Sequence, residues 1–371
     1  MQLFLSLLPL FDSFRDRQAT DPRDKVFALL NVASDTKNSD LKADYHKPHA
    51  EVYALTAKWL LRTQKSLAFL SLVEKKDKPD LISWVPDFRY KDSMNFLHQP
   101  TQIFRGDSHV YYASGRASAP IVEEESSYQL TVLGIYVGTI VARTEPAGNL
   151  LNSAAICSRV LDNGQWQQLA RTCAANALYL EPIDLAYHRL RIWDLLPNKG
   201  LGRRQRKSPP TEIPQPGPIS SNYAMDALVH SALEDIRISV LRGTTRKRMF
   251  KTETGYMGIA HRSVELGDKI FVLIGGDMPF VLRPFGGNYF GFGGESYVHG
   301  IMDGEMLGIA KANREARDGL PSGDVKVLSW IDRHGRAGAG VTDLSSLELC
   351  YVKLWLVGNS HPKRRLLFVS R

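Results

Sequence analysis

The chain has 371 residues, 43% of them hydrophobic and 23% charged, a composition typical of a globular protein large enough for two domains. Its three cysteines show no metal-site spacing and are too few for a disulfide-stabilised secreted domain, so they indicate a reducing, cytoplasmic location. The net charge of +8 is concentrated in three basic runs at 199–207, 242–251 and 363–371. The first lies in a proline-rich segment without aromatics, which favours solvated loops over a nucleic-acid surface.

The first eleven residues, MQLFLSLLPLF, are apolar but do not resemble a signal peptide, because no basic residue precedes them and no small-residue cleavage site follows. They are also fewer than the roughly 20 residues that span a bilayer, so we expect no membrane span here. We predict a helix, interrupted at Pro9, that packs on its neighbours. An abrupt apolar start is also what a truncated domain would show.

The stretch TDPRDKVFALLNVASD (20–35) predicts a short helix with a strong start. Asp21 is expected to cap the first backbone N–H groups, Pro22 to occupy the first helical position, and Asp24 to complement the helix dipole. The apolar face of this helix consists of Val26, Leu29 and Leu30.

A second helix is predicted from Pro48, with an apolar stripe of Val52, Leu55 and Trp59. The stripe is widened by Tyr53, Ala57, Leu60 and Leu61. The apolar run 67–73 is expected to be a buried strand or helical turn. In SWVPDF (83–88), Trp84 and Val85 are predicted core anchors, Pro86 fixes the chain exit, and Asp87 caps or holds a nearby backbone N–H.

From about residue 103 the pattern becomes β-rich, with strands expected at 109–115 and 128–141. Helical periodicity returns at 149–196, a mobile proline-rich loop is expected at 196–221, and another helical piece at 222–241. Residues 246–307 read as short strands between glycine-containing turns, which predicts a small barrel or twisted sheet with 149–241 as a helical insertion.

Sequence motifs for catalysis are sparse. The chain has no G-x-S-x-G elbow, Walker A loop, H-E-x-x-H or C-x-x-C pair, and GGNYFGFGGES fails the dinucleotide fingerprint and is interpreted as a flexible β-turn region. In GESYVHGIMDGE, alternation places Tyr297, His299 and Ile301 on one side of a strand. An acid, base or metal role is conceivable for Glu295, His299, Asp303 and Glu305, but a half-buried histidine with ordinary hydrogen bonds is the simpler interpretation. We therefore predict no cofactor and no metal. RKRMFKTETGYMGIAH is interpreted as an ordinary sheet surface, with an arginine-lined anion pocket as the alternative.

Taken in order, TDPRDKVFALLNVASD, DYHKPHAEVYALTAKWLL and LISWVPDF resemble the second half of the fungal heterokaryon-incompatibility (HET) domain. RMFKTETGYMGIA, ELGDKIFVLIGGDMPFVLRP and GESYVHGIMDGEML resemble the region that follows it in many such proteins. The resemblance implies an α+β fold: a helical partial HET module, distantly TIR-like, at 1–100; a β-rich domain at 101–310; and a divergent extension at 311–371. It also implies a structural signature formed by Asp21, Pro22, Arg23, Asp24, Trp84, Pro86, Asp87, Gly255, Gly258, Gly267, Asp268, Glu295, Tyr297, His299, Gly300, Gly304 and Glu305.

Three departures qualify the resemblance. The N-terminal half of the HET domain has no counterpart here, Asn31 stands where glycine is usual, and Phe88 stands where tryptophan is usual. We therefore carry over no catalytic residue, and we expect an uncovered apolar face around residues 1–35.

The function implied is that of a cytoplasmic, truncated protein resembling effectors of non-self recognition and programmed cell death. It would act on a protein partner, either an incompatibility partner or a second copy. The alternatives are an enzyme, either NAD-cleaving like some TIR domains or performing a tailoring step in a fungal metabolite cluster, and a module whose β unit binds a small molecule or peptide.

Overall fold

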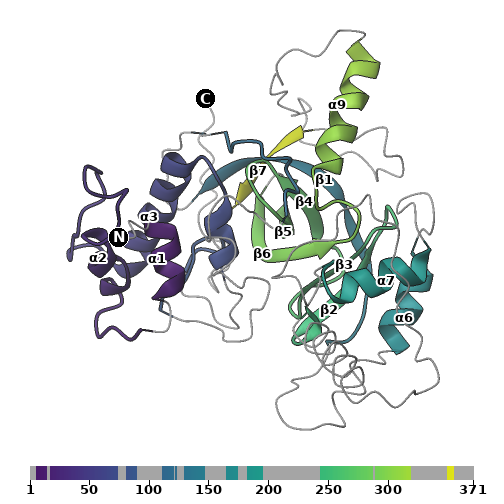
Figure 1. Cartoon of the computed structure of the whole chain (residues 1–371), viewed down its shortest axis with the longest axis horizontal. Helices are drawn as coiled ribbons and strands as arrows, with labels where there is room; N and C mark the ends of the chain where they lie inside the picture. The colour runs from purple at the N-terminus through teal and green to yellow at the C-terminus, as the bar shows by residue number, and fades with distance from the viewer. Residues whose placement is uncertain are drawn as a thin grey trace, which may run out of the picture.

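The structure is a computed structural model that describes residues 6–14, 17–73, 81–89, 111–120, 122, 129–146, 164–173, 182–194, 243–286, 289–318 and 349–354. The fold is α+β, with N-terminal helices on one side of a β-barrel and further helices on the other (Figure 1). Within the described ranges, no helix is both long and apolar enough to cross a membrane. The predicted loop at 196–221 and helical piece at 222–241 lie outside these ranges, as do the first and third basic runs.

We call the N-terminal part (residues 6–89) the helical module. Its described residues form three α-helices and a 3₁₀ helix: α1 (Leu7–Ser13), α2 (Asp24–Leu30), α3 (His49–Gln64) and η1 (Ala68–Leu72). The predicted start of α2 is two residues too early. The carboxylate of Asp21 accepts hydrogen bonds from the backbone N–H and the guanidinium of Arg23, so it does not cap the helix, and Arg23 is the residue that precedes it. Pro22 accordingly lies before the helix.

The β-barrel is closed by strand pairing in the order β1-β2-β3-β6-β5-β4-β1, with every pair antiparallel. A seventh strand, β7, pairs antiparallel with β1 and parallel with β6. The strands are β1 (Leu130–Arg143), β2 (Lys247–Thr252), β3 (Met257–His261), β4 (Lys269–Leu273), β5 (Pro279–Gly286), β6 (Tyr289–Val298) and β7 (Leu349–Leu354). This confirms the barrel alternative of the sequence analysis.

Three strand assignments from the sequence need correction. In the stretch 109–115, the described residues form no strand, and residues 113–116 are a turn. The N–H groups of Ala113 and Ser114 donate to carbonyls of the turn at 274–278, and that of Tyr112 donates to the Met302 carbonyl. The glycine run 289–294 belongs to β6 and is not a turn. A Cβ at Gly293 would lie 2.8 Å from the Val281 carbonyl oxygen, so the glycine lets β6 approach β5. Residues 349–354, assigned to an extension, belong to the sheet.

The end of β6 corrects the expected placement of His299 within a strand. β6 ends at Val298, so His299 lies just beyond the strand and not within it. Three helices complete the described elements: α6 (Gly164–Arg171), α7 (Ile183–Arg191) and α9 (Glu305–Asp318). The first two fall within the predicted helical insertion.

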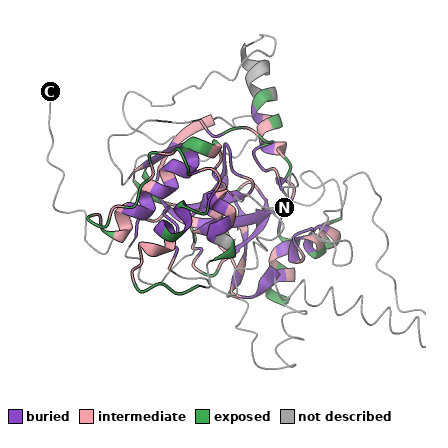
Figure 2. Cartoon of the chain, turned by 60° about the vertical axis from the view of Figure 1, so that its left-hand side comes forward, coloured by how far each residue is buried: buried purple, intermediate pink, exposed green. Residues whose placement is uncertain are grey.

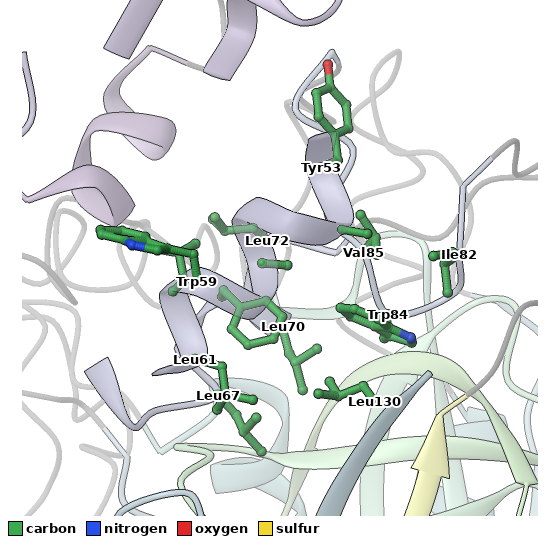
Figure 3. Close-up of a cluster of buried hydrophobic side chains, with 14 of the residues drawn as sticks. Tyr53, Trp59, Leu61, Leu67, Leu70, Leu72, Ile82, Trp84, Val85 and Leu130 are labelled. Carbon is green, nitrogen blue, oxygen red and sulfur yellow. The ribbon is translucent and has the colours of Figure 1, made fainter. Parts of the chain in front are cut away.

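Alternating side chains divide the core between the two faces of the barrel wall. On β4, Phe271 and Leu273 pack in one hydrophobic cluster with α1, α2, α3 and η1. Ile270 and Val272 pack in a second cluster with α6, α7 and α9. Trp84, predicted as a core anchor, is fully buried in the first cluster, and Figure 3 shows it among Leu70, Ile82 and Leu130. The hydrophobic core therefore runs without interruption from the helical module into the barrel.

The expected bare apolar face around residues 1–35 is not found in the described part of that segment. Leu7 and Val26 are fully buried, and the leucines and phenylalanines of α1 and α2 are nearly so, while Pro9 is half-buried and Ala28 is exposed. Figure 2 shows how much of the described helices is buried. Only two large apolar side chains are exposed here, Phe14 at 42% and Val32 at 59%. The barrel supplies the covering layer, because its wall contributes to the same cluster.

The turn between β4 and β5 (residues 274–278) joins the barrel to the helical module. The N–H of Leu67 donates to the Gly275 carbonyl (2.8 Å), and the N–H of Gly275 donates to Ser114 Oγ (3.2 Å). The N–H of Ala119 donates to the Lys65 carbonyl at the end of α3 (2.7 Å). Three chain segments far apart in sequence therefore meet at one glycine.

Candidate functional site: two aspartate–arginine pairs at the start of α3

A polar cluster surrounds the first turn of α3 and begins with the motif at 21–24. The Arg23 guanidinium binds the Asp21 carboxylate through Nε–Oδ1 (2.9 Å) and Nη2–Oδ2 (2.7 Å). Its remaining nitrogen, Nη1, donates to the carbonyls of Tyr45 (2.5 Å) and Lys47 (3.1 Å). Arg23 therefore fixes the segment that leads into α3 against the segment that leads into α2.

A second pair with the same geometry lies in the SWVPDF segment. Arg89 binds Asp87 through Nε–Oδ1 (2.8 Å) and Nη2–Oδ2 (2.7 Å), and its backbone N–H also donates to Oδ1 (3.0 Å). Its Nη1 lies 3.3 Å from Nε2 of His49, the first residue of α3. The expectation that Asp87 holds a nearby backbone N–H is confirmed. Both pairs follow the pattern Asp-x-Arg, and each arginine uses its spare nitrogen to reach the start of α3.

Tyr53 lies between the two pairs and touches both motifs. Its hydroxyl donates to the Pro22 carbonyl (2.5 Å), and its ring packs edge-on against Phe88, with centroids 5.0 Å apart. Phe88 in turn stacks on Phe11 of α1, with centroids 4.1 Å apart. One buried tyrosine on α3 thus couples the polar cluster to the hydrophobic core.

Electrostatics hold the cluster in its ionised form. Hydrogen bonds from Arg23 lower the pKa of Asp21 to about 2, and the same contact raises the pKa of Arg23. The Tyr45 hydroxyl donates to Asp24 Oδ1 (2.5 Å), and this bond raises the pKa of Tyr45. The Tyr45 ring lies under the Arg23 guanidinium, 5.2 Å from its carbon, and is 54% exposed.

The chemistry of this arrangement favours positioning and contact. Each carboxylate of the two pairs already accepts at least two guanidinium hydrogen bonds, so neither is poised to accept a proton from a substrate. Across the described ranges, no group of three or more His, Cys, Asp and Glu side chains is arranged to hold a metal ion. The Tyr45 ring beside Arg23 is left about half exposed.

The signature residues of the barrel serve other contacts. Asp268, which is almost fully buried, binds Arg283 through two hydrogen bonds of 2.8 Å and accepts the backbone N–H of Glu265 (2.8 Å). Arg283 also donates to the Ser263 carbonyl, so the pair fixes the turn before β4 to β5.

The Tyr297–His299 pair forms a second barrel contact. The Tyr297 hydroxyl lies 3.2 Å from His299 Nδ1, and both side chains are buried. Tyr111 and Trp193 pack against the Tyr297 ring, and the Tyr111 hydroxyl donates to the Trp193 carbonyl (2.6 Å). Glu295 is buried on the same strand, and Glu305 accepts the N–H of Asp303 (2.6 Å) at the start of α9.

The signature glycines occupy turns or close approaches. A Cβ at Gly258 would lie 2.3 Å from the Phe250 ring, which explains glycine at that position on β3. The remaining four have positive φ angles between 87° and 90°, namely Gly255, Gly267, Gly300 and Gly304.

Sequence reasoning missed the partners that complete the α3 cluster. It treated Tyr53 only as part of an apolar stripe and assigned no role to Tyr45, His49 or Arg89. A signal was present, since Asp-Pro-Arg at 21–23 and Asp-Phe-Arg at 87–89 share one spacing. A bidentate ion pair between an aspartate and the arginine two residues later needs no tertiary contact, so this spacing can be recognised before a fold is known.

Comparison with known proteins confirms the resemblance to HET proteins. Residues 217–317 match the family model of the Het-6 beta-barrel domain. The chain is also 25% identical, over 363 aligned residues, to heterokaryon incompatibility protein 6, OR allele, of Neurospora crassa. That alignment covers 82% of this chain and 52% of the relative, so the chain spans about half the length of the curated protein it matches. No solved structure matches the chain significantly.

Proposed function

We propose that this chain is a heterokaryon-incompatibility-like protein that acts in non-self recognition in the cytoplasm and leads to growth arrest and cell death through contact with a protein partner. The observation that carries the proposal is the alignment with a heterokaryon incompatibility protein across 82% of the chain. An alignment of that extent must include parts of both the helical module and the barrel, so the likeness is not limited to one element.

The α3 cluster supports contact as the mode of action. Arg23 and Asp21 neutralise one another, while the Tyr45 ring beside them is half exposed and held by its hydroxyl bond to Asp24. A preorganised tyrosine next to an arginine is typical of the residues that contribute most to protein interfaces. We assign the partner-facing surface of the helical module to Tyr45 and its neighbours.

The test is inducible expression of the whole chain in a fungal host, scored for growth arrest and for uptake of a dye that enters dead cells. We expect arrest with the unchanged chain and weaker arrest with Tyr45→Ala. Val32→Ala is the matched control, because Val32 is 59% exposed on the same module and lies outside the cluster. Immunoblots must show equal amounts of all three proteins.

Growth equal to that with the empty vector would overturn the proposal. If both variants lose growth arrest equally, Tyr45 is not part of the contact surface, but the proposed function is unaffected. Release of nicotinamide from NAD by the purified chain would replace contact by catalysis as the mode of action.

A further inference from the structure

Four of the large apolar side chains that the structure leaves exposed lie at one end of the barrel wall. Their exposed fractions are 50% for Val141, 60% for Leu266, 51% for Phe285 and 41% for Tyr289. We call these four residues the apolar rim. They come from β1, the turn before β4, the end of β5 and the start of β6.

Strand register shows that the four positions are neighbours. Gly267, next to Leu266, donates its N–H to the carbonyl of Ile140, next to Val141 (3.0 Å). The Asp268–Arg283 pair ties the start of β4 to the end of β5, and Gly286, next to Phe285, is paired with Tyr289. Because neighbouring strands lie about 4.8 Å apart, the rim is a row roughly 15 Å long.

The apolar rim is held by ion pairs and lies away from the 274–278 turn, although Ser83 of the module also accepts the N–H of Phe292 on β6 (3.1 Å). The module is tied to the turn at 274–278, which lies at the opposite ends of β4 and β5. Two ion pairs link the segments that carry the rim, Asp268–Arg283 (2.8 Å) and Glu265–Arg143 (2.7 Å). Apolar side chains at turns therefore stay exposed on a well-supported edge, a position that polar residues usually occupy.

The size of the rim argues against a second protein as its occupant. A stable protein interface buries roughly 800 Å² on each partner. Even at about 250 Å² for a whole aromatic side chain, four side chains that are each about half exposed offer only roughly 500 Å². A lipid surface does not need a large complementary area, because each apolar side chain enters it independently.

The charges beside the rim favour an anionic surface. The segments at this end that carry the rim hold four of the basic and three of the acidic side chains named below, a net charge of +1. The neighbouring β2, with the turn after it, and β7 add three basic side chains and one acidic one, which brings the net charge at this end to +3. The acids Glu265 and Asp268 are engaged by Arg143 and Arg283, as stated above, and Arg262 is exposed on the turn beside Leu266. The basic side chains are Arg143, Arg248, Lys251, Arg262, Lys269, Arg283 and Lys353, and the acidic ones are Glu145, Glu253, Glu265 and Asp268.

We propose that the apolar rim is a peripheral membrane-docking edge: Val141, Leu266, Phe285 and Tyr289 insert into the interfacial layer of a bilayer while the surrounding basic side chains bind anionic headgroups. This combination of a few inserted apolar residues with nearby positive charge is how peripheral proteins attach to lipid surfaces. The inference goes beyond the proposed function and does not rest on it, since it requires neither a partner protein nor cell death.

The experiment is co-sedimentation of the whole purified chain with lipid vesicles. One set is phosphatidylcholine alone, and the other contains about 30% phosphatidylserine, which gives the surface a negative potential. We expect binding to the phosphatidylserine vesicles, weaker binding at high salt, and little binding to phosphatidylcholine alone. Leu266→Asp and Phe285→Asp should each lower the partition coefficient about tenfold or more, because each removes one inserted apolar side chain.

Val32→Asp is the matched control, since Val32 is as exposed as Leu266 but lies on the helical module. It should bind vesicles like the unchanged chain, and thermal melts should show all variants folded. Equal weakening by the Val32 and Leu266 variants, or no binding to anionic vesicles, would overturn the proposal. A concentration-dependent dimer that Leu266→Asp dissolves would identify the rim as an interface between copies and would equally overturn it.

Discussion

Replacing Gly275 by alanine tests whether close main-chain packing at the 274–278 turn holds the helical module to the barrel. Gly275 has a φ of +90°, and a Cβ there would lie 2.5 Å from Ala119 Cβ and 2.6 and 2.7 Å from its backbone N and Cα. The positive φ costs an alanine about 1–2 kcal/mol. The overlap adds about 1–3 kcal/mol, as overpacking typically does. We therefore expect Gly275→Ala to lower the free energy of unfolding by about 2–5 kcal/mol.

Gly267→Ala separates the two contributions. Gly267 has nearly the same φ, +87°, but a Cβ there would meet nothing within 4 Å. Its substitution should cost only the backbone strain, about 1–2 kcal/mol. The entropy that a glycine gives the unfolded chain is lost in both variants and cancels in the difference. Denaturant unfolding of the three proteins provides the comparison.

A third variant sharpens the reasoning. Ala119→Gly removes the nearest carbon but leaves the backbone N and Cα of residue 119 in place, so it should not rescue Gly275→Ala. Equal unfolding free energies for Gly275→Ala and Gly267→Ala, within about 0.5 kcal/mol, would refute the reasoning, because differences of that size are within the scatter of surface substitutions. Full rescue by Ala119→Gly would show that the side chain and not the backbone sets the contact.

The other predictions concern single polar groups. Arg283→Met should lower the free energy of unfolding by about 2–3 kcal/mol, because it leaves the buried Asp268 carboxylate with fewer donors, and adding Asp268→Asn should restore much of it. The bonds from Arg23 lower the pKa of Asp21 from 3.8 to about 2, so the stability they contribute is present above pH 4 and is lost as the pH falls through about 2. Burial raises the pKa of Cys173 to about 11, so the folded chain should react slowly with thiol reagents at this cysteine.

Each of these has a direct measurement. Denaturant unfolding of the Arg283 single and double variants decides the first, and a double variant less stable than the single one contradicts it. For the second, the stability difference between the unchanged chain and Asp21→Asn should vanish on acidification. A difference that grows instead would mean that the sign is wrong. Mass spectrometry of labelled Cys173, before and after unfolding in urea, checks the third.

The elements that the sequence predicted well are those with strong local signals. The helix from His49 and the strand from Leu130 carry clear periodicities, and both are present. Local reasoning failed where tertiary contacts compete. Asp21 would cap a helix in isolation, but the side chain of Arg23 is a stronger donor than the free N–H groups and takes the carboxylate.

The candidate site could be predicted only in part. The residues of the first pair were singled out from the sequence, but their partners at Tyr45 and Lys47 are bound through main-chain carbonyls, which leave no trace in residue type. The glycine run of β6 was predicted wrongly as a turn, also because its tertiary contacts cannot be seen in the sequence. Glycine is typical of turns, and only the close approach of Val281 explains why it stands inside a strand.

The pairing of β7 has a consequence for synthesis. Residues 130–135 of β1 pair with residues 349–354, which are synthesised more than 200 residues later. Val352 and Leu354 of β7 pack in the same hydrophobic cluster as α1, α2 and α3. Strands so distant in sequence pair late in folding. The apolar face of the helical module therefore lacks its contacts with β7 until most of the chain has left the ribosome.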